Sequence, residues 1–144
     1  MSLVDSNASK YLQAVADTLK TELELKNSDI HGGAFNLSEI KTVAKKSPCA
    51  FVALLELDDN IDKTCLHTAC PLSPVVFLFV QGNKRNADII DLAAKAKSVI
   101  KGNRFGQDYA TGATNVKAKN LYTKELGELK VGAWVVNFRT NITP

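Results

Sequence analysis

The sequence has little of the chemistry from which active sites are built. Its 144 residues include two histidines, three cysteines and one tryptophan. A catalytic histidine needs an acid, base or nucleophile within hydrogen-bond reach, yet His31 and His67 lie in unrelated segments, and no serine stands in a nucleophile elbow. The single glycine after the apolar run at 75–80 matches neither common phosphate-binding pattern. We therefore expect no enzyme activity, no catalytic residue and no cofactor.

Two groups of potential metal ligands lack the spacing of known metal sites. The acidic run at 58–60 has none of the alternating oxygen ligands, the glycine or the final glutamate of a calcium loop. Cys65, His67 and Cys70, even with Cys49 as a fourth ligand, match no common zinc pattern. We interpret the first group as the polar tip of a hairpin and the cysteines as buried or strand residues, and we expect no metal site.

Long apolar runs and a strong net charge are also absent. Apolar runs such as 75–80 are far shorter than the ~20 residues of a membrane-spanning helix. The net charge is only +3, from 18 basic and 15 acidic residues, which is too small for a typical nucleic-acid-binding surface. An odd number of cysteines and a start unlike a secretory signal indicate a reducing compartment. We expect a soluble protein made in the cytoplasm, with neither a membrane nor a specific nucleic acid as a partner.

What the sequence does contain is a set of strand patterns. Residues 48–57 are apolar at both alternating sets of positions, which predicts a strand covered on both faces. Residues 74–80 have the same pattern, and residues 131–142 alternate between apolar and polar. Both segments have the composition to pair with 48–57. In the last strand, Trp134, Val136, Phe138 and Ile142 are expected to face the core, and Asn137, Arg139 and Asn141 to face the other way.

Amphipathic segments supply the layers over this sheet. Apolar residues recur at helical spacing in 7–25 and 86–101, and a shorter helical turn is expected at 37–44, before Pro48. The expected caps are Ser6 or Asn7, Ser38 and Asn86, with Gly102 ending the last helix.

The remaining segments are expected to be irregular or short. Residues 27–29 are expected to end the first helical pattern, and residues 31–33 are interpreted as a loop that contains His31. Residues 104–115 are interpreted as a long flexible loop, a kind of segment that often serves binding or assembly. A short edge strand is expected at 63–69, a polar strand at 115–122 and a turn at 124–128. The sequence thus predicts a single α+β domain over 1–144, with one mixed or mainly antiparallel sheet of about four to five strands covered by two main helices.

The order of these elements resembles a known family. The capped first helix, the strand that starts at Ser47-Pro48, the hairpin into 74–80, the alanine-rich helix and the closing strand at 132–139 look like Mu-like prophage tail proteins. More broadly, this layout is similar to the tail-terminator and head-tail completion proteins of long-tailed phages. The resemblance covers nearly the whole chain, through patterns of polarity rather than unique residues.

The resemblance implies a structural role in virion assembly. Subunits of this kind join edge to edge into a ring, expected to be a hexamer, that caps the tail tube and then docks to the head. The implied partners are other copies of the chain, the tail tube protein and the head-tail connector protein. The implied locations are the cytoplasm of the host bacterium during assembly and then the tail of the virion, at the head-tail junction.

A ring needs two different, complementary surfaces on each subunit. The sequence offers the hairpin tip at 58–63, the loop at 104–114 and the outward-facing row of the last strand. The candidate interface residues are Asp58, Asp59, Lys63, Arg104, Asp108, Tyr109, Asn137, Arg139 and Asn141. For each of them, the alternative is a solvated loop or an exposed sheet face.

Two other classes of function are compatible with the pattern. One is a small ligand-binding or regulatory α+β domain, which needs an apolar concavity with a few convergent polar groups. The other is a nucleic-acid module, which needs aromatic and basic side chains interleaved on one sheet face, whereas Trp134 and Phe138 share a face with aliphatic residues and are expected to belong to the core.

Overall fold

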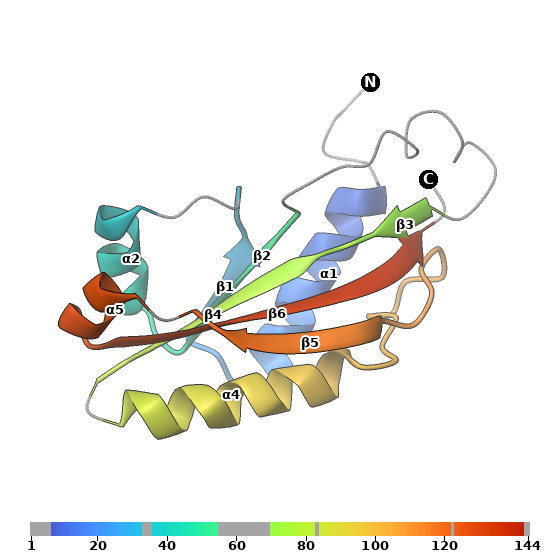
Figure 1. Cartoon of the computed structure of the whole chain (residues 1–144). Coiled ribbons are helices and arrows are strands. Elements are labelled where there is room, and N and C mark those ends of the chain that lie inside the picture. The colour runs from blue at the N-terminus through green and yellow to red at the C-terminus, as the bar shows by residue number, and fades with distance from the viewer. Residues whose placement is uncertain (1–6, 33–35, 55–69, 83, 122, 143–144) are drawn as a thin grey trace.

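The computed structural model describes residues 7–32, 36–54, 70–82, 84–121 and 123–142 (Figure 1). Its helices are α1 (Asn7–Glu22), α2 (Leu37–Ala44), α4 (Arg85–Ile100) and α5 (Lys124–Glu128). Its strands are β1 (Asn27–Ile30), β2 (Cys49–Ala53), β3 (Cys70–Leu72), β4 (Val75–Gln81), β5 (Thr114–Asn120) and β6 (Val131–Ile142). The α+β fold predicted from the sequence is confirmed, with six strands where four to five were expected.

The strands form one mixed sheet. Its order is β1-β2-β4-β6, with β5 on the far side of β6 and β3 beside the C-terminal part of β6, in line with β4. Only β1 and β2 are parallel; the other pairs are antiparallel. The prediction that 131–142 could pair with 48–57 is wrong, because β4 lies between β2 and β6. Pro74, which has no N–H to donate, separates β3 from β4, and its carbonyl accepts from the Phe138 N–H at 3.3 Å.

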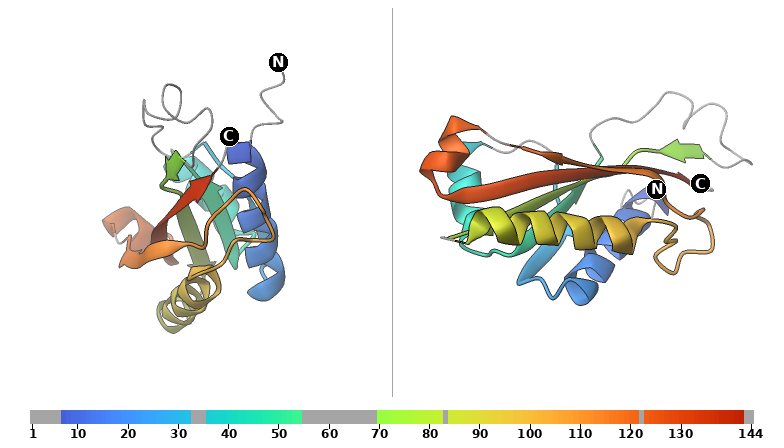
Figure 2. Two further views of the ribbon diagram at one scale, coloured as in Figure 1. Left: turned by 90° about the vertical axis from the view of Figure 1, so that its right-hand side faces the viewer. Right: turned by 60° about the horizontal axis from the view of Figure 1, so that its bottom comes forward.

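Side chains alternate between the two faces of this sheet. On the first face, α1 and α4 pack over the even-numbered positions of β2, β4 and β6, such as Val52, Leu78 and Val136. On the second face, α2 and α5 pack over odd-numbered positions, such as Phe51 and Phe79. Figure 2 shows α1 and α5 on opposite sides of the sheet. The expectation that β2 and β4 are covered on both faces is therefore correct, since every residue of β2 is buried.

Strand β1 was not predicted. Residues 27–29 were expected to end the first helical pattern, ahead of a loop at 31–33, but 27–30 form β1, which pairs with β2 along its outer side. Three of its four residues are polar, so it has no apolar alternation to reveal it. It forms because its backbone extends the sheet and because the Ser28 hydroxyl donates to the Ala16 carbonyl of α1 at 2.7 Å.

Two of the predicted helix caps, Ser38 and Asn86, are wrong. The side chain of Asn36, rather than Ser38, caps α2 by accepting from the Glu39 N–H at 2.8 Å. Helix α4 begins after Lys84 without a side-chain cap, so Asn86 lies inside its first turn. Gly102 follows the end of α4 with a φ of +72°, as expected for a terminating glycine. The expected turn at 124–128 is the short helix α5.

The segment between α4 and β5 is packed, in contrast to the flexible loop that the sequence predicts. Phe105 is buried, and its ring lies edge-on to that of Tyr11, with centroids 5.7 Å apart. Two backbone hydrogen bonds close the loop at its base: Gly102 donates to Ala113 at 2.8 Å, and Ala113 donates to Asn103 at 3.0 Å. Because the loop buries side chains of its own, it behaves as part of the core.

Candidate functional site

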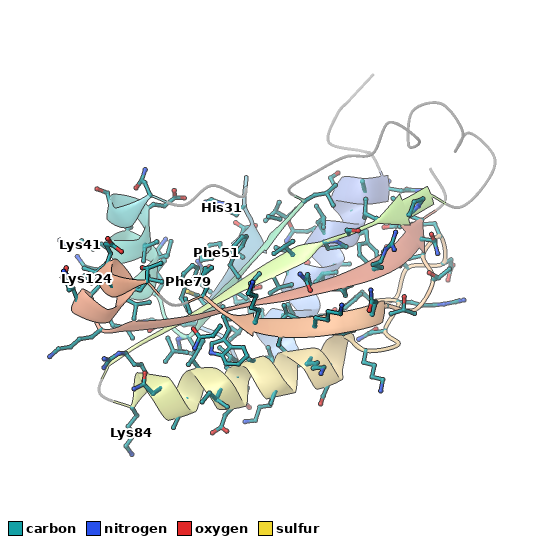
Figure 3. The ribbon with its side chains drawn as sticks, viewed as in Figure 1. His31, Lys41, Phe51, Phe79, Lys84 and Lys124 are labelled. Carbon is teal, nitrogen blue, oxygen red and sulfur yellow. The ribbon has the colours of Figure 1, made fainter. Side chains whose placement is uncertain are left out.

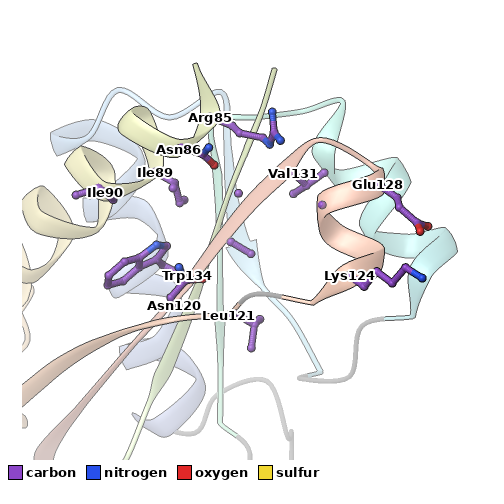
Figure 4. A pocket seen from close by; sticks show the side chains of 13 residues that line it. Arg85, Asn86, Ile89, Ile90, Asn120, Leu121, Lys124, Glu128, Val131 and Trp134 are labelled. Carbon is purple, nitrogen blue, oxygen red and sulfur yellow. The ribbon is translucent and has the colours of Figure 1, made fainter. Parts of the chain in front are cut away.

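A groove lies where α4 begins, beside the end of β5 and the short helix α5 (Figure 4). Its volume is about 560 Å³, within the range of small-molecule sites and of sites for one or two protein side chains. The side chains around it are Arg85, Asn86, Ile89, Ile90, Asn120, Leu121, Lys124, Glu128, Val131 and Trp134. The groove therefore combines an apolar interior with a polar rim.

Glycine at position 132 allows this groove to form. A Cβ atom there would lie 3.0 Å from Ile89 Cγ2 and 3.1 Å from the Arg85 carbonyl oxygen. The first turn of α4 therefore rests directly on the backbone of β6. Two residues later, the half-buried Trp134 lies between α4 and β5 and forms the back of the groove.

The opposite wall is set by a local capping interaction. The Thr123 hydroxyl accepts from the Leu126 N–H at 3.1 Å and starts α5, while Leu126 anchors the helix in the core of the second face. This fixes Lys124 and Glu128 at the groove. On the α4 side, Arg85 is held by a hydrogen bond from Nη1 to the Gly82 carbonyl at 3.2 Å.

The groove is also where exposed apolar side chains gather. In the described part of the chain, the large apolar residues left exposed are Ile30, at 36%, Ile90, at 54%, and Leu121, at 37%. Ile90 and Leu121 line the groove beside β5, and Ile30 lies on β1 at the other edge of the sheet. The two neighbouring side chains at the groove mark a candidate contact surface, whereas Ile30 is exposed singly.

A second surface holds the outward-facing row predicted on the last strand. Asn137, Arg139 and Asn141 are exposed on the second face, beyond the part that α2 and α5 cover. Asn137 and Arg139 border a shallow cavity of about 350 Å³, together with Asn115, Lys117, Ser73, Val75 and Phe138. This lining carries two cations and no acidic residue.

The loop candidates lie at the far end of β6. Arg104 and Asp108 are exposed, and Tyr109 is half-buried. The loop meets Asn141, whose carbonyl accepts from the Thr111 N–H at 2.9 Å and whose N–H donates to the Thr111 hydroxyl at 3.0 Å. The structure thus joins this loop to Asn141 through Thr111. Asp58, Asp59 and Lys63, like the predicted strand at 63–69, lie outside the described residues.

A pair of buried tyrosine hydroxyls lies under this loop. The hydroxyls of Tyr11 and Tyr109 are buried and have no hydrogen-bond partner among the described residues. Burial raises the pKa of Tyr11 to about 12, an effect that nearby Thr140 opposes and Tyr109 reinforces, and burial also raises the pKa of Tyr109. The Thr140 hydroxyl instead donates to the Thr111 carbonyl at 2.8 Å. Both phenols are therefore neutral at physiological pH.

His31 and Cys49 are both held by packing contacts within the fold. The Nε2 atom of His31 contacts a carboxylate oxygen of Glu39, and its ring lies edge-on to that of Phe51, with centroids 5.8 Å apart (Figure 3). Cys49 is fully buried, and burial raises the pKa of its thiol to about 12, with a smaller opposing effect of Lys46. Among the described residues, no three histidine, cysteine or acidic side chains come together in a way that could hold a metal ion.

The groove residues were not identified from the sequence, and Trp134 was assigned wholly to the core. Two signals were available. Ile90 is a large apolar residue next to Ile89, off the apolar stripe of α4, and Leu121 follows the mostly polar strand β5. Each is apolar where the local pattern predicts a solvent-facing side chain.

Comparison with known protein families and with curated proteins finds no match to this chain. None of the described helices is long and apolar enough to cross a membrane. We therefore infer function from the surfaces described above and from the resemblance in the order of elements.

Proposed function

We propose that this protein is a structural subunit of a phage or prophage tail, a tail terminator or head-tail joining protein. In this proposal, its copies assemble into a ring that caps the tail tube and offers a docking surface to the head. The resemblance of the chain to Mu-like prophage tail proteins suggests a hexamer. The tail tube protein and the head-tail connector are its partners, and no catalytic step is involved.

One observation carries this proposal: the sheet has a different open edge on each side of the molecule. In the part of the chain that the structure describes, β1 and β5 each pair with a strand on one side only. The edge at β5 adjoins the groove with Ile90 and Leu121, whereas the edge at β1 carries Ile30. Two unlike surfaces on opposite edges allow head-to-tail contacts, which generate rings when the rotation closes.

The test is the mass of the assembled particle. Light scattering across a series of protein and magnesium concentrations, followed by negative-stain imaging, is expected to find rings of about six subunits. If the free subunit stays monomeric, the same measurement with added tail tubes is expected to show rings at the tube ends. A particle that is monomeric in every condition and does not bind tail tubes would contradict the proposal.

The groove supports a second candidate, a domain that binds a small ligand. Its apolar interior, with Trp134, Arg85 and Lys124 around it, fits a small apolar molecule with a negatively charged group. Trp134 is the only tryptophan, so a fluorescence screen reads this site directly. Saturable binding by a protein that neither forms rings nor binds tail tubes would favour this candidate over the first.

A further inference from the structure

We infer that the ring contact is made by β1 of one copy pairing antiparallel with β5 of the next, an inference that rests on the proposed function. The directions of the strands allow it. Since β1 is parallel to β2, and each step from β2 to β4, β6 and β5 reverses direction, β5 runs opposite to β1. A second copy in the same orientation therefore meets β5 in the antiparallel arrangement, which is the more stable one.

The two edges also lie at the same height across the sheet. One row of paired residues runs from β1 through β2, β4 and β6 to β5 and consists of Asp29, Phe51, Phe77, Val135 and Lys119. The neighbouring row contains Ile30, Val52, Val76, Val136 and Ala118. A copy related by rotation about an axis along the strands therefore brings Asp29 opposite Lys119 and Ile30 opposite Ala118, with no slide of one strand past the other.

The side chains at these positions are complementary on the second face. Directly paired residues share a face, so Asp29 and Lys119 both lie on the second face, and Lys117 lies on the same side two residues from Lys119. All three are exposed. One Asp29 oxygen accepts from the Ile30 N–H at 2.8 Å in the single subunit. Pairing with Ala118 would engage this N–H instead, and the carboxylate oxygens can then accept from a lysine of the neighbouring copy.

The first face supplies the apolar part of the contact. Ile30 lies on this face with Ser28, and in the joined sheet its diagonal neighbour beyond Ala118 is Asn120, a wall of the groove. The contact therefore brings Ile30 to the first-face side of the groove, where Ile90 lies, and buries apolar surface of Ile30 that is exposed in the single subunit.

Backbone groups at the β5 edge are placed for this pairing. The Leu121 N–H donates to the Ala133 carbonyl at 2.9 Å, and antiparallel pairs alternate between bonded and non-bonded positions. The backbone groups of Ala118 and Asn120 are therefore directed away from β6. An edge strand with outward-directed N–H and C=O groups is a template for another strand.

A charge exchange tests the contact on the full-length protein. Asp29→Lys and Lys119→Glu each place like charges opposite one another, and each is expected to raise the protein concentration at half-assembly by about tenfold. An equimolar mixture of the two variants is expected to assemble again, because each new side chain then faces an opposite charge on the other variant. The matched control is Lys10→Glu in α1, an exposed charge that lies on neither edge strand, which is expected to assemble like the unmodified protein.

Fluorescence of Trp134 gives an independent reading of the same contact. Assembly is expected to shift its emission to shorter wavelength, because Ile30 of the neighbouring copy displaces water at the groove. The Ile30→Asp variant is expected to lose both the shift and the rings, while its far-ultraviolet circular dichroism is unchanged, since Ile30 is exposed.

The outcomes separate the interface from the function. If rings form but both charge variants assemble like the unmodified protein, the β1–β5 contact is wrong and the proposed function stands with another interface. If the single variants fail to assemble and their mixture also fails, the pairing of Asp29 with Lys119 is wrong. If the unmodified protein forms no ring with or without tail tubes, both the function and the contact are contradicted.

Discussion

The hydroxyl of Ser28 donates a hydrogen bond to the main-chain carbonyl of Ala16, at 2.7 Å, in a position where Ser28 is only 8% exposed. This contact joins the edge strand β1 to the helix that covers it. In the described part of the chain, β1 has one neighbouring strand and a single apolar residue, so the bond to α1 adds to the backbone pairing with β2 that holds it in place. The edge that we propose for assembly is therefore supported in part by this serine.

Removing this hydroxyl is expected to weaken the attachment of β1. Ser28→Ala should lower the free energy of unfolding by about 1 kcal/mol, the typical net value of one buried hydrogen bond. Urea unfolding followed by circular dichroism measures the change. The control is Ser98→Ala on the exposed side of α4, which should change stability by less than about 0.5 kcal/mol. Equal effects of the two substitutions would mean that the Ser28 bond does not stabilise the fold.

Gly132 is expected to tolerate no side chain. Gly132→Ala places a Cβ atom 3.0 Å from Ile89 Cγ2 and 3.1 Å from the Arg85 carbonyl, so α4 or β6 must move. Such overpacking should destabilise the protein by about 1–3 kcal/mol and change the emission of Trp134. Gly32→Ala is the matched control, since a Cβ atom there meets nothing within 4 Å. Unchanged stability in Gly132→Ala would show that the contact of α4 with β6 is looser than described.

Removing the hydroxyl of Tyr11 is expected to stabilise the fold. The side chain is fully buried, and its hydroxyl has no hydrogen-bond partner among the described residues. Tyr11→Phe keeps the ring contact with Phe105 and removes a polar group that burial has separated from water. The free energy of unfolding should rise by about 1 kcal/mol, measured by thermal or urea unfolding. A loss of stability would indicate that the hydroxyl has a partner.

Stability is expected to fall in alkaline solution. Burial raises the pKa of Tyr11 from 10.0 to about 12 and that of Cys49 from 9.0 to about 12. The unfolded chain releases these protons first, so it binds fewer protons than the folded chain at high pH. The contribution of Tyr11 and Cys49 to the free energy of unfolding is complete below about pH 9 and is lost as the pH rises toward about 12.

Urea unfolding at several pH values from about 8 to about 11 measures this loss. In the Tyr11→Phe variant, the free energy of unfolding should decline less steeply above about pH 10, because this variant has no phenol to titrate at position 11. Identical curves for the variant and the unmodified protein would mean that Tyr11 does not titrate differently in the two states.

Much of the fold followed from local patterns, whereas the candidate site did not. The apolar stretches around β2 and β4, the alternation of β6 and the stripes of α1 and α4 are each readable within a few consecutive residues. The groove is different, because Arg85, Leu121 and Trp134 come from three separate elements. Only Ile90 and Leu121, apolar where a polar residue was expected, gave any local sign of it.

The sequence by itself determined that this chain folds as α+β, since burying apolar residues at periods of 2 and 3.6 leaves few other solutions. The tertiary structure alone decided that residues 27–30 join the sheet, because polar Asn27, Ser28 and Asp29 become a strand only when β2 supplies backbone partners and α1 a carbonyl. It also decided that β4 separates β2 from β6, and that Asp29 and Lys119 lie in the same row of paired residues on opposite edges of the sheet. Pairings between distant segments depend on how all the strands pack together, and no local pattern encodes them.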